Sequence, residues 1–184
     1  TNHGHIYRFC ICQIANVEFG GIFIPYYQVR QLARFKRAFD ALFMRSVSSF
    51  VCVGAQRFIE GHRLNEFFAE GAAHVGIVVQ GGLYNSLLRA MERLGLADVY
   101  GRSRVPLYVM NVAYPLVDAE LLRFCAGKRA VLLVEEGQPN FIEQGIASVL
   151  RKHDLQTRLV GKDPFPIAGE YSPEVLHTGL RAFF

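Results

Sequence analysis

Two consecutive carboxylates, Glu135 and Glu136, are the residues whose type and position best suit catalysis in this sequence. They follow an apolar run, residues 131–134, that has the length and branching of a buried strand. Gly137 and Pro139 then break the chain before a helical pattern begins. Two carboxylates at the carboxyl edge of a sheet can shift each other's pKa and act as general acid or base. We prefer the alternative, because no nucleophile, metal motif or cofactor motif accompanies them: one glutamate caps the helix, and the other is solvated or meets a neighbouring subunit.

A glycine pair at another strand-to-helix junction, Gln80-Gly81-Gly82, is a second candidate site. Free N–H groups at a helix start, with no side chain in the way, can bind a phosphate or a carboxylate. The segment matches neither G-x-G-x-x-G nor a P-loop, so the motif by itself names no ligand. The alternative is a tight turn that needs glycine for its geometry.

The histidines and cysteines give no metal site and no disulfide framework. No two histidines lie four residues apart on a helical stretch, and no pair of cysteines has metal-ligand spacing with a second pair or with histidines. Free thiols in a reducing compartment are the preferred interpretation of the four cysteines. No serine lies in a nucleophile elbow, so we expect neither a self-contained active site nor a bound metal.

The net charge of +4 is concentrated towards the amino terminus. Residues 1–63 hold eight Lys or Arg against three Asp or Glu. A nucleic-acid binder could use such a segment, but the aromatic–basic interleaving of RNA-binding sequences is missing, so a solvated helix face is preferred. No apolar stretch is long and uncharged enough to span a membrane, and no secretory signal is recognisable. We therefore expect a soluble cytoplasmic protein that binds neither nucleic acid nor membrane.

Strand and helix patterns alternate along the chain, which predicts an α/β fold with a parallel sheet covered on both faces. Less regular patterns precede them: a helix over 28–46 with basic residues interleaved, and a broken helix over 58–68. An ordered loop is expected over 162–171. The regular elements are expected at 74–80 (strand), 83–94 (helix), 105–112 (strand), 118–126 (helix capped by Asp118), 131–134 (strand, then helix), 157–160 (strand) and 174–182 (helix).

Four segments carry a resemblance to a known family: GIVVQGGLYNSLLRAMERLGL (76–96), VAYPL (112–116), VLLVEEGQPNFIEQ (131–144) and GKDPFPIAGEYSPEVL (161–176). In order and spacing they resemble the large subunit of indolepyruvate:ferredoxin oxidoreductase, a thiamine-diphosphate-dependent 2-oxoacid:ferredoxin oxidoreductase. The tail Gly-Lys-Asp…Pro…Gly-Glu after the Glu-Glu strand is the most specific element. The resemblance covers about residues 56–184.

The resemblance implies a domain similar to the C-terminal domain of transketolases, a three-layer α/β/α sandwich with a mostly parallel sheet. It also implies a parent enzyme that decarboxylates an arylpyruvate on thiamine diphosphate, forms an acyl-CoA and reduces ferredoxin. That enzyme uses thiamine diphosphate, Mg, iron–sulfur clusters and coenzyme A. The sequence has no Gly-Asp-Gly…Asn motif and no Cys-x-x-Cys-x-x-Cys run, so we expect none of these cofactors on this chain.

These observations predict an extension or linker over residues 1–55 and a transketolase C-terminal-like domain over 56–184. Its expected role is structural, docking the pyrimidine- and diphosphate-binding domains, the small subunit or its fused equivalent, and, in the whole enzyme, ferredoxin. The alternative is a stand-alone module that binds a small ligand or nucleotide at the glycine pair. No catalytic residue is predicted. The residues expected at the docking edge are Gln80, Gly81, Gly82, Tyr84, Tyr114, Glu135, Glu136, Lys162 and Asp163.

Overall fold

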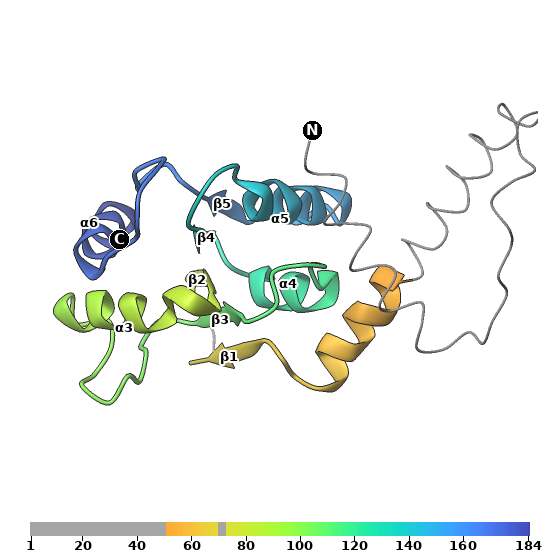
Figure 1. The fold of residues 1–184 in the computed structure, drawn as a ribbon, viewed down its shortest axis with the longest axis horizontal. Coiled ribbons are helices and arrows are strands. Elements are labelled where there is room, and N and C mark those ends of the chain that lie inside the picture. Colours follow the sequence, from red (N-terminus) through yellow and green to blue (C-terminus); the bar gives the residue numbers. More distant parts are fainter. Residues whose placement is uncertain (1–50, 70–72) are drawn as a thin grey trace, which may run out of the picture. The chain divides into compact units, whose positions relative to one another are not determined.

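The computed structural model describes residues 51–69 and 73–184, all within one compact unit, Val47–Phe184 (Figure 1). Residues 51–61 form a helix. The labelled elements that follow are β1 (Glu66–Phe68), β2 (Val75–Gln80), the 3-10 turn η1 (Gly81–Leu83), α3 (Tyr84–Arg93), β3 (Leu107–Met110), α4 (Asp118–Cys125), β4 (Ala130–Val134), α5 (Phe141–Lys152), β5 (Arg158–Val160) and α6 (Pro173–Phe183).

The five strands form one sheet in the order β1-β3-β2-β4-β5. Strands β2 to β5 pair in parallel, and only the edge strand β1 runs antiparallel to its neighbour. Figure 1 shows α3 and α6 on one side of the strands and α4 and α5 on the other. The predicted three-layer α/β/α sandwich with a mostly parallel sheet is therefore confirmed.

Alternation along the strands divides the core into two halves, because successive side chains point to opposite faces of a sheet. In β2, Ile77 and Val79 face the half that holds α3 and α6, whereas Val78 faces the half that holds α4 and α5. All three side chains are fully buried. A strand covered on both faces is apolar at every position, and this explains the unbroken run that predicted it.

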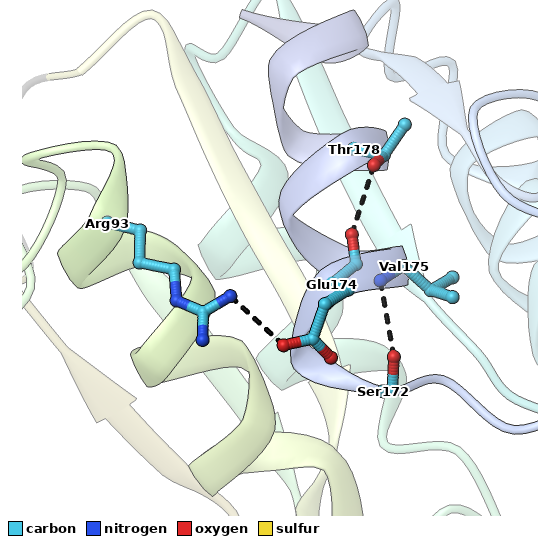
Figure 2. A network of polar contacts seen from close by, with 5 residues as sticks. All are labelled: Arg93, Ser172, Glu174, Val175 and Thr178. Carbon is cyan, nitrogen blue, oxygen red and sulfur yellow. Dashed lines mark hydrogen bonds and ion pairs between the residues drawn. The ribbon is translucent and has the colours of Figure 1, made fainter.

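Helix α6 begins with a well-formed cap and pairs with α3, as Figure 2 shows. The Ser172 hydroxyl accepts a hydrogen bond from the Val175 N–H at 3.4 Å, and Pro173 occupies the first turn. Glu174 in that turn forms an ion pair at 3.1 Å with Arg93, which lies in the last turn of α3. Each charge therefore also suits the dipole of its own helix.

Two sequence expectations about local structure are wrong. The sequence predicts one broken helix over 58–68, but the helix stops at residue 61 and the second part of this segment forms strand β1. Strand β1 pairs with β3, and Phe67 stacks on Tyr108 of that strand. Tertiary pairing therefore overrides the apolar spacing that indicated a helix. Asp118 does not cap α4: it is the first helical residue, and Val117 holds the cap position without a side-chain hydrogen bond.

The remaining predicted strands and helices are confirmed within a few residues at each end. The helix expected over 28–46 and the basic residues before position 51 lie outside the described part of the chain, as do Cys10 and Cys12. The helix at 51–61 crosses the boundary expected between residues 55 and 56, and the division into an extension and a domain stays a prediction.

Candidate functional site

The candidate site is the carboxyl edge of the sheet, where β2, β3 and β4 end side by side. Gln80 is the last residue of β2, and Asn111 and Glu135 directly follow β3 and β4. The side-chain oxygen of Gln80 accepts a hydrogen bond from the Glu136 N–H at 2.8 Å. The glycine turn and the acidic turn, which the sequence predicts separately, are thus brought together at one edge.

Glu135 caps helix α5. Its two carboxylate oxygens accept hydrogen bonds from the N–H groups of Ile142, at 2.9 Å, and Glu143, at 3.0 Å. These are among the first N–H groups of a helix, which have no partner inside it. The Glu135 side chain is only 4% exposed, so both oxygens are used inside the protein. The capping alternative therefore describes Glu135, and the carboxylate is not available as a solvent-facing base.

Glu136 holds a different segment, the C-terminal loop (residues 161–172). Its carboxylate accepts a hydrogen bond from the Tyr171 N–H at 2.6 Å. Two further bonds join the same loop to the acidic turn: the Gln138 amide donates to the Ile167 carbonyl at 3.1 Å, and the Lys162 ammonium donates to the Gly137 carbonyl. The loop expected to be ordered is thus fastened to the acidic turn at three points.

Tyr171 anchors the C-terminal loop from inside. Its ring is 2% exposed and packs against Phe165, and its hydroxyl donates to the Pro166 carbonyl at 3.0 Å. Burial raises the pKa of Tyr171, and the nearby carboxylates of Glu136 and Glu135 raise it further. The phenol therefore stays neutral at physiological pH and serves as a structural anchor.

Only one of the two glycines in the glycine turn, Gly81, is required for steric reasons. A Cβ placed on Gly81 would overlap the Asn111 side chain and approach the Asn111 Cα to 3.2 Å, because β3 ends directly beside it. A Cβ on Gly82 would meet nothing within 4 Å. Gly81 therefore permits a close approach of two strand ends, whereas Gly82 leaves open space.

Three of the other predicted edge residues have different environments. Tyr84 is half-buried and stacks on Phe68, with ring centroids 5.3 Å apart, so it contributes to packing. Tyr114 is 78% exposed in the loop between β3 and α4. Asp163 lines a groove of about 630 Å³ with the first residues of β2, β4 and β5, at the opposite edge of the sheet. The structure therefore does not bring Asp163 together with the acidic turn.

The sequence interpretation missed two exposed apolar residues at the carboxyl edge. Phe141, the first residue of α5, is 69% exposed, and Ile167 in the C-terminal loop is 66% exposed. With Tyr114 they place large apolar side chains on two loops and on the first residue of α5, all at the carboxyl edge. Their positions at helix starts and in a Pro-rich loop were the available signal, since neither belongs to the apolar face of a regular element.

A buried polar cluster near the edge strand β1 was also missed. The Tyr108 hydroxyl donates to the Glu120 carboxylate at 2.7 Å, and the Asn65 amide donates to the same oxygen at 2.9 Å. The Asn65 carbonyl oxygen accepts from the Val112 N–H at 3.0 Å. Burial, followed by the bond to Glu120, raises the pKa of Tyr108 far above its ordinary value. The cluster joins the residue before β1 to β3 and α4, and its polar groups are satisfied internally.

Among the described residues, no three His, Cys, Asp or Glu side chains are grouped so that they could hold a metal ion. Over the same residues, no helix combines the length and the apolar character that crossing a membrane needs.

The chain forms an α/β domain. At the carboxyl edge of its sheet, Glu135 caps helix α5 and Glu136 holds the C-terminal loop. No family model matches the chain. It is similar to the indolepyruvate oxidoreductase subunit IorA of Methanothermobacter thermautotrophicus, with 28% identity over 120 residues, 64% of this chain and 18% of the relative. The subunit IorA of Methanothermobacter marburgensis is 26% identical over 128 residues, 68% of this chain and 19% of the relative. The resemblance predicted from the sequence is confirmed, and the chain spans less than a fifth of these relatives.

Two solved structures are similar to the chain at lower identity. A 2-oxoglutarate:ferredoxin oxidoreductase from Magnetococcus marinus has 23% identity and a TM-score of 0.43, over 64% of this chain and 19% of that one. A split-gene transketolase, an inactive tetramer, has 19% identity and a TM-score of 0.45, over 64% of this chain and 40% of that one. The fold assignment rests on the sheet order and layers of the chain itself.

Proposed function

We propose that the chain is a docking domain of a 2-oxoacid:ferredoxin oxidoreductase of the indolepyruvate type, similar to the C-terminal domain of transketolases. The similarity to two IorA subunits supports the family, and the name of these relatives, indolepyruvate oxidoreductase, supports an arylpyruvate as the substrate of the parent enzyme. The short span of the match supports a domain rather than a whole enzyme. Residues 56–184 would form this domain, in a cytoplasmic enzyme.

The observation that carries the docking role is the set of three exposed apolar side chains at the carboxyl edge, Tyr114, Phe141 and Ile167. A single exposed apolar residue is ordinary on a protein surface, but several gathered at one edge favour an interface. The loops that present them are held in place: Gln138 fastens the Ile167 loop, and Glu135 fixes the start of α5. The edge is therefore preorganised, which lowers the entropic cost of binding a partner.

The division of labour follows from what the carboxylates already do. Glu135 and Glu136 each accept backbone hydrogen bonds. Protonation of Glu135 would weaken the cap of helix α5, and protonation of Glu136 would weaken the bond that holds the C-terminal loop. Thiamine diphosphate, Mg, iron–sulfur clusters and coenzyme A would belong to other parts of the parent enzyme. The partners of this edge would be its pyrimidine- and diphosphate-binding domains, with the small subunit or its fused equivalent, and ferredoxin acting on the assembled enzyme.

The test replaces Tyr114, Phe141 and Ile167 together by serine in the assembled enzyme. Serine at exposed positions leaves the fold intact, so we expect normal thermal unfolding of the isolated chain but an assembly weakened at least tenfold, measured by sedimentation. The matched control is Phe58→Ser, since Phe58 is also more than half exposed but lies on the helix at 51–61. Unchanged assembly in the triple variant would refute the docking role.

A calorimetric titration of the isolated chain with thiamine diphosphate separates docking from cofactor binding. We expect weak or undetectable heat, because the sequence has no Gly-Asp-Gly…Asn motif and no three His, Cys, Asp or Glu side chains of the described residues are grouped to hold a metal ion. Micromolar binding would overturn the proposed division of labour.

A further inference from the structure

The loop between α3 and β3 presents two neighbouring large apolar side chains that are both about three-quarters or more exposed, and one of them is the most exposed in the described part of the chain. Val99 is 74% exposed and Tyr100 is 84% exposed, next to each other at the tip of residues 97–103, here called the tip loop. Figure 1 shows this green loop standing out beyond α3 and the strands. It starts after α3, at the edge of the sheet opposite the acidic turn, because β3 begins where the loop ends.

Asp98 makes the tip loop rigid. Its carboxylate accepts hydrogen bonds from the N–H groups of Tyr100, at 2.9 Å, and Arg102, at 2.8 Å. Its backbone completes the turn: the Asp98 N–H donates to the Arg102 carbonyl, and the Asp98 carbonyl accepts from the Gly101 N–H, both at 3.0 Å. Four hydrogen bonds across a few residues are typical of an Asx-type turn with a single conformation.

Both ends of the tip loop are closed as well. Ala97 and Ser103 form an isolated antiparallel bridge, and the Arg104 N–H donates to the Leu96 carbonyl at 2.8 Å. Gly101 has φ of +77°, a left-handed conformation that favours glycine. Ordering this loop costs conformational entropy, and burial of the apolar side chains at its tip does not offset that cost, because they are exposed.

Two arginines follow the apolar tip in the sequence. Arg102 and Arg104 are both exposed, and neither guanidinium donates a hydrogen bond to any residue that the structure describes. Asp98, the nearest carboxylate in sequence, is occupied by two backbone N–H groups. An exposed aromatic side chain with arginines close by in the sequence resembles an interface hot spot, in which an aromatic anchor fills a pocket and arginines pair with its rim.

We propose that the tip loop is a second docking element, which inserts Val99 and Tyr100 into an apolar pocket of a neighbouring subunit or domain rimmed by carboxylates. The charge of Arg102 and Arg104 favours a carboxylate rim, because basic groups there would repel the two arginines. Because the turn is already ordered, binding of the aromatic anchor loses little additional loop entropy. The proposal rests on the chain being part of a larger assembly, as the proposed function states, but it uses the opposite edge of the sheet.

The experiment measures how accessible the tip is in the assembled enzyme. A Tyr100→Cys variant is labelled with a maleimide in the isolated chain and in the assembly, and the modified peptide is quantified by mass spectrometry. We expect labelling at least tenfold slower in the assembly. A Tyr114→Cys variant, labelled in parallel, reports the carboxyl edge, so failure of this inference and failure of the proposed function give different results.

Further variants test the chemistry of the pocket. Arg102→Glu should weaken assembly at least tenfold more than Arg102→Gln, and the difference should shrink at high salt. Asp98→Ala keeps Tyr100 but loosens the turn, and should weaken assembly by about tenfold. Equal labelling of Tyr100→Cys in both forms, or equal effects of the two Arg102 variants, would overturn the proposal. Sedimentation of the full chain with phosphatidylserine-containing vesicles, abolished by Tyr100→Ser, would assign the loop to a membrane surface instead.

Discussion

Replacing Glu135 tests whether the acidic turn is structural or catalytic. The carboxylate accepts two hydrogen bonds from the first turn of α5 and is almost fully buried. A hydrogen bond to a charged group contributes about 1.5–3 kcal/mol to stability. A negative charge at a helix start adds about 0.3–1 kcal/mol. Because the two bonds share one side chain and are not additive, Glu135→Ala should lower the free energy of unfolding by about 3–5 kcal/mol.

The Glu135→Gln variant refines this estimate. Glutamine keeps one acceptor oxygen but turns an NH₂ donor towards the second N–H group, and it removes the charge. We expect a loss of about 1.5–3 kcal/mol, roughly half of the alanine effect.

Urea unfolding of the isolated chain provides the measurement. With an m-value of about 2 kcal/mol per M, the midpoint should fall by about 2 M for Glu135→Ala and by about 1 M for Glu135→Gln. The matched control is Ser148→Ala, at an exposed position on the same helix, which should leave the midpoint within about 0.3 M. An unchanged midpoint in Glu135→Ala, together with loss of activity in the assembled enzyme, would refute the capping argument and restore the catalytic one.

Three further predictions concern other parts of the described chain. Tyr108→Phe removes the hydroxyl that donates to the buried Glu120, and should cost about 1–3 kcal/mol in urea unfolding; a gain in stability would contradict the cluster's role. Gly81→Ala should lower the melting temperature because its Cβ overlaps Asn111, whereas Gly82→Ala, whose Cβ meets nothing within 4 Å, should change it little; equal shifts in the two variants would contradict the steric argument. A backbone hydrogen bond, then its ion pair, holds the pKa of Glu174 below its ordinary value of 4.5. Its stabilisation is complete above pH 4.5 and disappears as the pH falls through the lowered value. The difference in melting temperature between wild type and Glu174→Gln should therefore vanish in acid, and a difference that persists there would contradict it.

The regular elements could be predicted because their signals are local. The apolar run in β4 and the helical spacing of Ile142, Ile146 and Val149 in α5 each correspond to one geometry of the backbone. The layers followed from the alternation of strands and helices. The strand β1 could not be predicted in the same way, because its three residues become a strand only by pairing with β3.

In the candidate site, the acidic turn likewise has features that local sequence predicts and others that depend on tertiary structure. The sequence determined that two carboxylates follow a buried strand and precede a helix, since strand, break and helix are all encoded within fifteen neighbouring residues. Only the tertiary structure decided what each carboxylate does: Glu135 turns inwards to the start of α5, whereas Glu136 reaches the backbone of Tyr171, thirty-five residues away. Hydrogen bonds between distant segments depend on which loops the sheet order brings together, and no local pattern of residues carries that information.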